Sequence, residues 1–101
     1  PTEFALSQNY PNPFNPTTAI QFYLPEEAFV NLKVYNTLGQ EVASLLNHEQ
    51  MTDGAQEVEF NAQALASGIY FYRIVADGIP DTDDGTPGSH FVQSKKMMLI
   101  K

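Results

Sequence analysis

Apolar and polar residues alternate with a period of two along most of this chain, between turn-forming residues that recur about every ten positions. The stretch "FVNLKVYN" at 29–36, for example, directs Val30, Leu32 and Val34 to one side and mostly polar residues to the other. Such alternation is typical of strands that are buried on one face. The pattern predicts an all-β chain, and its seven expected strands fit a seven-stranded immunoglobulin-like antiparallel β-sandwich.

The expected strands lie at 4–8, 17–24, 29–36, 41–46, 55–60, 69–76 and 90–101. The strand at 69–76 is apolar on nearly both faces, so we expect it to be central. Val42 and Leu45 are expected core residues, and Gly39 is expected to supply a positive φ in a tight turn. Asn47–Gly54 reads as a polar loop, and Asn61–Gly68 as one helical turn that tucks Leu65 under the sandwich.

Composition supports a single domain spanning residues 1–101 and excludes several functions. With 12 acidic and 5 basic residues, the chain has a formal net charge of −7, which disfavours nucleic-acid binding. It has no cysteine, so a disulfide framework and a thiol nucleophile are excluded. No apolar run is long enough to span a membrane. Because the sequence starts at Pro1 without a signal-peptide pattern, we expect it to be a piece of a longer protein.

No pattern of residues predicts catalysis. His48 and His90 fall in or beside expected polar loops, without a serine and an acid placed around them. The chain also has no glycine-rich phosphate loop and no HExxH pattern. We therefore predict that it is not an enzyme and needs no cofactor.

A long acidic segment, Asp77–Ser89, is expected to connect the last two strands. Its carboxylates could surround a calcium ion, which prefers several oxygen ligands. The spacing does not match an EF-hand loop, and a solvated acidic loop is the simpler interpretation. The candidate calcium ligands are Asp77, Asp81, Asp83 and Asp84.

Aromatic residues in the expected central strand raise the question of a sugar-binding platform. Tyr70, Phe71 and Tyr72 are consecutive, so alternation sends Phe71 to the face opposite the two tyrosines. They cannot form one patch, and packing in the core and on the sheet surface is the favoured interpretation.

The segment "YPNPFNP" at 10–16 is rigid, because each proline fixes its own φ and disfavours the helical region for the residue before it. We interpret it as an extended crossover that delivers Thr17 into the next strand. Phe14 is expected to plug one end of the sandwich.

The C-terminal stretch "KKMMLIK" contains Lys95, Lys96 and Lys101, which are three of the five basic residues. Charges that flank an apolar strand can simply prevent aggregation at a sheet edge. They can also form a recognition element that a partner reads by adding a strand, or that a second copy uses in a homodimer through the last strand. Spacing alone leaves both interpretations open.

Taken together, "YPNPFNP", "VYNTLGQEVASL", "LASGIYFYRI" and the terminal "KKMMLIK" resemble the type A C-terminal sorting domain of the type IX secretion system. The motifs occur in the expected order, and the resemblance covers Phe4 to Lys101. The 77–89 segment departs from it, because this family usually has a shorter hairpin there.

The resemblance implies an immunoglobulin-like sandwich and a role in protein export. Such domains are fused behind a cargo protein, which the type IX translocon carries from the periplasm across the outer membrane. A cell-surface sortase then cleaves ahead of the domain, and the cargo is anchored at the surface or released. By matching position, the recognition elements implied for this chain are Gly68, Tyr70, Lys95, Lys96 and Lys101.

Two other functions are compatible with parts of the sequence. An immunoglobulin-like accessory module of a secreted enzyme could bind carbohydrate or a cell surface, but it would need an exposed aromatic strip. The immunoglobulin-like part of the flagellar hook-capping protein shares the proline–asparagine opening. We would expect a tryptophan near Phe60 in that protein and no terminal lysine motif, whereas this chain has no tryptophan and has the lysines.

Overall fold

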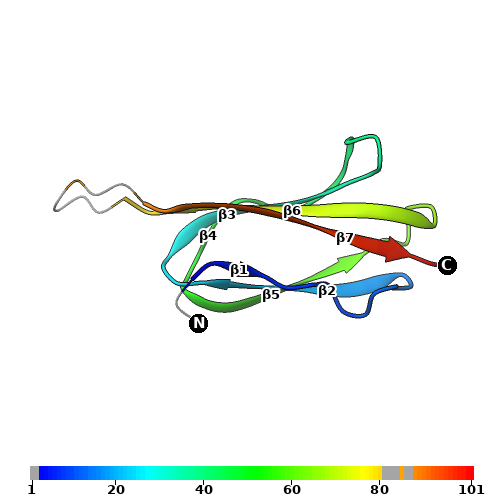
Figure 1. The fold of residues 1–101 in the computed structure, drawn as a ribbon, viewed down its shortest axis with the longest axis horizontal. Helices are drawn as coiled ribbons and strands as arrows, with labels where there is room; N and C mark the ends of the chain where they lie inside the picture. Colours follow the sequence, from blue (N-terminus) through cyan, green and yellow to red (C-terminus); the bar gives the residue numbers. More distant parts are fainter. Residues whose placement is uncertain (1–2, 81–84, 86–87) are drawn as a thin grey trace.

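Two antiparallel sheets pack face to face and enclose the core (Figure 1). The computed structural model describes residues 3–80, 85 and 88–101. The smaller sheet has the strand order β1-β2-β5, and the larger has the order β4-β3-β6-β7. The strands are β1 (Ala5–Leu6), β2 (Thr17–Leu24), β3 (Ala28–Tyr35), β4 (Glu41–Met51), β5 (Gly54–Asn61), β6 (Gly68–Gly78) and β7 (His90–Leu99). The predicted all-β, seven-stranded sandwich is confirmed.

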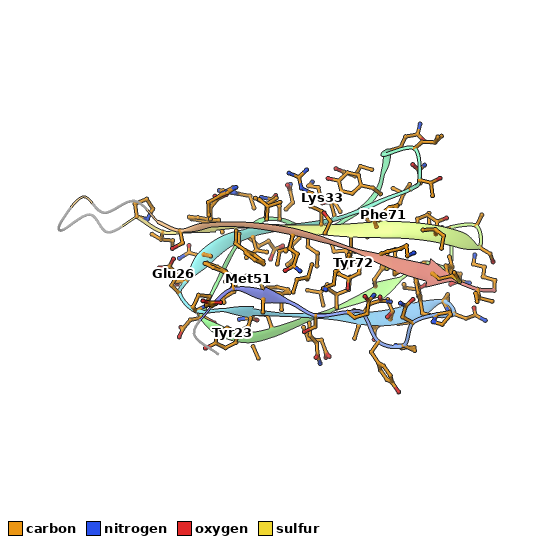
Figure 2. The ribbon with its side chains drawn as sticks, viewed as in Figure 1. Tyr23, Glu26, Lys33, Met51, Phe71 and Tyr72 are labelled. Atoms are coloured by element: carbon orange, nitrogen blue, oxygen red, sulfur yellow. The ribbon has the colours of Figure 1, made fainter. Side chains whose placement is uncertain are left out.

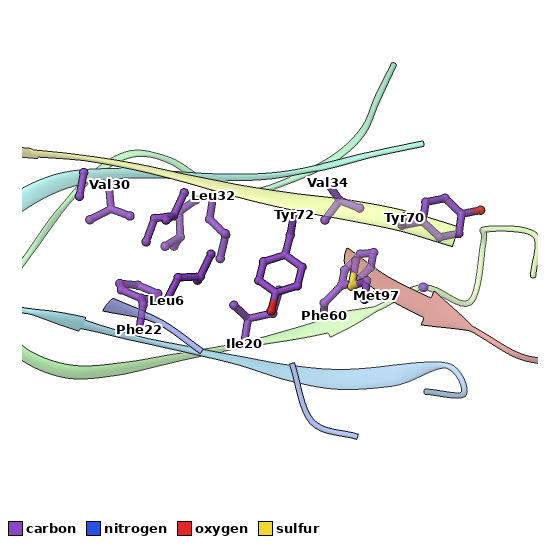
Figure 3. Packing of buried hydrophobic residues seen from close by; sticks show 14 of the residues in the cluster. Leu6, Ile20, Phe22, Val30, Leu32, Val34, Phe60, Tyr70, Tyr72 and Met97 are labelled. Atoms are coloured by element: carbon purple, nitrogen blue, oxygen red, sulfur yellow. The ribbon is translucent and has the colours of Figure 1, made fainter. Parts of the chain in front are cut away.

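The core is built by the alternation in the sequence. Val30, Leu32 and Val34 of β3 are fully buried and face Ile20 and Phe22 of β2 across the space between the sheets (Figure 3). Burying one such side chain contributes roughly 1.5–3 kcal/mol relative to leaving it in water. These contacts hold the two sheets together.

Strand β6 is central in the larger sheet, as predicted, because it pairs with β3 on one side and β7 on the other. Its side chains alternate between the core and the outer face. Tyr70 and Tyr72 are buried, whereas Phe71 is exposed on the opposite face (Figure 2). The prediction that these aromatic residues do not form one patch is therefore confirmed.

The hairpin tip at Asn36–Gln40 joins β3 to β4 and rises away from the larger sheet (Figure 1). The side-chain oxygen of Asn36 accepts hydrogen bonds from the backbone N–H groups of Leu38 and Gln40, both at 3.0 Å. Gly39 has a φ of 81°, which confirms the predicted positive φ. Few residues other than glycine or asparagine adopt this conformation at low cost.

The prediction of a polar loop at Asn47–Gly54 is wrong. Strand β4 continues to Met51 and pairs with β3 through Glu49, Gln50 and Met51. Because β4 lies at the sheet edge, its side chains can be polar while its backbone still pairs. Register shifts along β4 also place Leu46 in the core. Val42 and Leu45, the predicted core residues, are only partly buried and pack against the core cluster.

The expected helical turn at Asn61–Gly68 is also wrong. The backbone N–H of Leu65 donates to the carbonyl of Ala62 at 2.9 Å, which closes a turn and not a helix. The side-chain oxygen of Asn61 competes for the N–H of Gln63 at 2.9 Å, as asparagine commonly does in turns. Leu65 still packs against the core.

The described residues contain no helix that could span a membrane.

The acidic segment begins later than predicted, because β6 extends to Gly78 and includes Asp77. Strand β7 starts at His90, whose ring nitrogen contacts the Asp77 carboxylate. The other three calcium candidates, Asp81, Asp83 and Asp84, lie outside the described residues. A calcium site in this segment stays a prediction.

Candidate functional site

The segment between β1 and β2 crosses from the smaller sheet to the larger one at one end of the sandwich. Tyr10 forms a bridge with Ala19 of β2, and Phe14 forms a parallel bridge with Leu99 at the end of β7. The bonds that precede Pro11, Pro13 and Pro16 are cis. We call residues 7–16 the crossover. It ties the start of the chain to its end.

Three hydrogen bonds join the crossover to residues 98–100. The N–H of Phe14 donates to the carbonyl of Met98 at 2.9 Å, and the N–H of Ile100 donates to the carbonyl of Phe14 at 3.0 Å. The side-chain oxygen of Asn12 accepts from the N–H of Met98 at 3.0 Å. The Phe14 side chain is 2% exposed, so the prediction that it plugs the sandwich is confirmed.

A buried polar network fixes the crossover against the core. The Tyr72 hydroxyl donates to the carbonyl of Ser7 at 2.7 Å and accepts from the N–H of Asn9 at 2.8 Å. The Asn9 side chain donates to the Thr18 hydroxyl at 3.0 Å, and that hydroxyl donates to the carbonyl of Pro11 at 2.9 Å. Burial raises the pKa of Tyr72 to about 12, and the hydrogen bond from the backbone N–H of Asn9 opposes part of this increase. Tyr72 therefore stays neutral over the physiological range.

The glycine–x–tyrosine motif opens β6, directly beside the end of β7. Gly68 pairs with Leu99, and Tyr70 pairs with Met97. Tyr70 is buried, and its hydroxyl donates to the carbonyl of Ala66 at 2.7 Å. Tyr70 is therefore a structural support of the turn before β6, and its ring is mostly hidden from a partner.

The three candidate lysines lie in different environments. Lys95 and Lys96 are consecutive in β7, so Lys95 points toward the inner side and is half-buried, whereas Lys96 is exposed on the outer face. Lys101 follows the strand; its N–H donates to the Ser67 hydroxyl at 3.0 Å, and its ammonium group donates to the carbonyl of Gln63. The structure therefore places Lys95 and Lys96 in the middle of β7 and Lys101 beyond its end, and the three lysines do not form one cluster.

The outer edge of β7 is already occupied at its C-terminal end. Besides the contacts of Phe14 and Asn12, the Gln8 side chain donates to the carbonyl of Lys96 at 2.7 Å. By the alternation of an antiparallel strand, the backbone groups of Val92 and Ser94 also point toward this edge. In the described part of the chain, no other segment forms a backbone hydrogen bond with these groups. Strand addition or dimerisation through β7 along 90–94 stays a prediction.

A small hollow lies where the crossover meets β6 and β7. Its volume is about 190 Å³, and its walls are mainly apolar. It is lined by Asn12, Pro13, Ile69, Lys96, Met97 and Met98. Each of these residues belongs to one of the proline–asparagine, glycine–x–tyrosine or terminal lysine segments. An apolar side chain of a partner could enter such a hollow, and a carboxylate beside it could pair with Lys96.

The histidines occupy structural positions. The His48 ring stacks on Phe29 with ring centroids 4.6 Å apart. The backbone N–H of His48 donates to the side-chain oxygen of Asn31 at 2.9 Å. His90 pairs with Asp77 at the far end of β6. Within residues 3–80, 85 and 88–101, no group of three or more metal-ligating side chains comes together.

Sequence reasoning named Gly68, Tyr70 and the lysines but missed the residues that hold them together. Asn12 acts through its side chain, and Asn9 through its backbone N–H, on segments far away in sequence. Local periodicity carries no information about such partners. The one usable signal was the unusual density of asparagine and proline in the crossover.

The architecture defines a small two-sheet sandwich whose distinctive surface is assembled from both ends of its chain. The family model of secretion system C-terminal sorting domains matches residues 8–82. The chain therefore belongs to this family, and its resemblance to type IX sorting domains is confirmed. No curated protein sequence matches it.

Solved structures share the fold at low sequence identity. The crystal structure of dimeric latent PorU from Porphyromonas gingivalis has a TM-score of 0.68 and 18% identity, over 96% of this chain and 9% of PorU. CopC from Methylosinus trichosporium OB3b has a TM-score of 0.59 and 13% identity, over 96% of this chain and 93% of CopC. These likenesses show the fold alone. The chain spans only about a tenth of the length of PorU.

Proposed function

We propose that this domain is a folded export signal, which directs a protein fused ahead of it across the bacterial outer membrane through the type IX machinery. The observation that carries the proposal is the parallel bridge between Phe14 and Leu99, beside the pairing of Tyr70 with Met97. Segments that are separate in sequence become one surface only in the folded domain. A receptor that reads this surface also checks that the signal is folded.

The terminal lysines are the charged part of this signal. Lys96 lies at the rim of the hollow, and Lys101 is positioned by the turn before β6. Gly68 and Tyr70 act by shaping this end of the sandwich and not by direct contact, because Tyr70 is only 8% exposed. The domain itself performs no chemistry in this proposal.

The cargo passes through the periplasm and reaches the cell surface or the medium. A sortase of the host then cuts the chain ahead of the sandwich and anchors or releases the cargo. Phe4 stacks on Phe91 of β7 with ring centroids 5.4 Å apart, so the chain is held in place from its first described residues. Cleavage N-terminal to Phe4 would leave the sandwich intact.

The proposal is tested by fusing the domain to a periplasmic reporter that carries a signal peptide. The fusion is expressed in a host with a type IX system and in the same host with its translocon disabled. We expect the reporter outside the cell only in the first host. If a sortase has acted, the exported reporter has lost the domain, and its mass is smaller by that amount. A folded domain whose reporter stays in the periplasm of both hosts would refute the proposal.

The alternative function, an accessory module that binds carbohydrate, is tested by a separate binding experiment. If both hosts retain the reporter, soluble polysaccharides would be titrated against the purified domain, with Tyr10 and Phe71 as the exposed aromatic residues to mutate. Binding that depends on Tyr10 or Phe71 would favour the accessory module.

A further inference from the structure

Positive charge is concentrated on the outer face of the larger sheet. The chain has five basic residues, and Lys33, Arg73 and Lys96 all point away from the core on this face. Lys33 is the direct cross-strand partner of Arg73, and Lys96 is the partner of Phe71. Figure 2 shows Lys33 and Phe71 on the side of the larger sheet that faces away from Tyr72.

This arrangement costs stability. Like charges directly opposite each other in a sheet repel, by an amount comparable to the roughly 0.2–1 kcal/mol of a favourable pair. Glu41 relieves part of the repulsion, since its carboxylate lies 3.6 Å from the Lys33 ammonium group. In the described part of the chain, no carboxylate forms an ion pair with Arg73. A feature that breaks a local rule with only partial compensation indicates a functional site.

The opposite face of the sandwich is more acidic. Strands β1, β2 and β5 contain no lysine or arginine, and Glu57 and Glu59 are exposed on β5. The whole chain has a formal net charge of −7. The two faces therefore differ in electrostatic potential, and an acidic partner is drawn to the larger sheet.

Apolar side chains lie among these cations. Phe71 is 37% exposed and Met98 is 39% exposed, and the half-buried Tyr35 and Ile69 adjoin them through strand pairing. An apolar centre surrounded by charged residues is the usual anatomy of a protein–protein interface.

The hairpin tip at 36–40 projects from the sheet and borders this face on one side. Leu38 is 81% exposed, yet the backbone that carries it is held by the hydrogen bonds of Asn36. A fixed loop loses little conformational entropy on binding, so an apolar residue at its tip is a suitable anchor. Between the hairpin and the sheet lies an open hollow of about 470 Å³, whose walls include Gly39, Phe71 and Arg73.

We propose that the outer face of β3, β6 and β7, together with the hairpin tip, is a docking surface for a protein that presents carboxylates beside an apolar pocket. Leu38 enters that pocket, and Arg73 and Lys96 pair with the carboxylates. The inference rests on the proposed function, because the partner is the part of the export machinery that reads this signal. A bilayer fits poorly, since the raised hairpin holds a flat surface away from Arg73.

The test measures reporter export for Leu38→Ser and Arg73→Gln in the host with a functional type IX system. Leu38→Met keeps an apolar anchor and is the matched control for the first variant. Glu59→Gln removes a charge from the opposite face and is the control for the second. Thermal unfolding followed by circular dichroism verifies that each domain is folded. We expect export to fall at least about tenfold for Leu38→Ser and Arg73→Gln, as for residues central to an interface, and both controls to export normally.

A photo-crosslinking residue at position 38 gives a second readout, with position 21 on the opposite face as its control. We expect a crosslink to an envelope protein from position 38 alone, and we expect Arg73→Gln to reduce it. Normal export of both variants, with crosslinks from position 21, would overturn the docking surface but leave the proposed function intact. Failure of the unmodified domain to export would remove both.

Vesicles of phosphatidylglycerol test whether the partner is a lipid surface and not a protein. Sedimentation of the purified domain with these vesicles, lost in Arg73→Gln, would assign the face to a lipid surface and overturn a protein partner. We expect the domain to stay in the supernatant.

Discussion

Phe14 and Leu99, near opposite ends of the chain, lie side by side as a parallel bridge that closes one end of the sandwich. The ring of Phe14 also packs on Phe60 of β5, with ring centroids 6.1 Å apart. One residue of the crossover thus joins both sheets. The stability of this end depends on it.

Replacing Phe14 with alanine should therefore lower the free energy of unfolding by about 3–5 kcal/mol, the usual cost of a buried phenylalanine. Urea denaturation measures this loss. Phe71→Ala, at a partly exposed position, is the matched control and should cost much less. Equal losses for the two variants would show that Phe14 is not a core residue.

Tyr72→Phe should destabilise the domain by about 1–3 kcal/mol, because it leaves the buried N–H of Asn9 without its acceptor. The substitution removes no apolar surface, so the effect isolates the hydrogen bonds. Tyr23→Phe on the outer face of β2 serves as the control. A loss for Tyr72→Phe no larger than that of the control would contradict the network described above.

The pH dependence of stability should also depend on Tyr72. Its folded pKa is raised to about 12 from an ordinary value near 10, so the folded state holds this proton more tightly than the unfolded state. The contribution is present in full below pH 10 and is lost as the pH rises through 10 toward 12. Denaturation at several pH values should show a steeper alkaline loss for the unmodified domain than for Tyr72→Phe. Parallel curves would contradict the shift.

Gly39→Ala should destabilise the domain by about 1 kcal/mol, because an alanine at a φ of 81° is strained. The cost is conformational, since a Cβ at this position meets no atom within 4 Å. Gly39→Asn should be milder, because asparagine tolerates this region. Thermal unfolding of both variants measures these losses. A Gly39→Ala variant as stable as the unmodified domain would show that the hairpin tip does not need this φ.

The alternation of residues was sufficient to predict both sheets and most of the core. It placed Val30, Leu32 and Val34 correctly because burial on one face imposes a period of two. It failed for Asn47–Met51 because the backbone of an edge strand can pair while its side chains remain in water. Periodicity could not reveal the turn at Asn61–Gly68, where a side chain competes for backbone N–H groups.

The candidate site was predictable only in part. Motif resemblance named Gly68, Tyr70 and the three lysines, but it did not indicate that Lys95 and Lys96 point to opposite faces. The contact between Asn12 and Met98 was not predictable, because it depends on how the crossover packs in three dimensions. The site is a property of the fold more than of any single motif.

The most direct test of the account compares export of a signal-peptide reporter carrying the intact domain with one in which Lys95, Lys96 and Lys101 are all glutamine. Substitution is preferable to deletion, because Met97 and Leu99 are buried and their loss would unfold the sandwich. The account predicts that the intact fusion leaves the cell, while the folded triple variant accumulates in the periplasm. Equal export of both fusions would show that the lysines are not the signal.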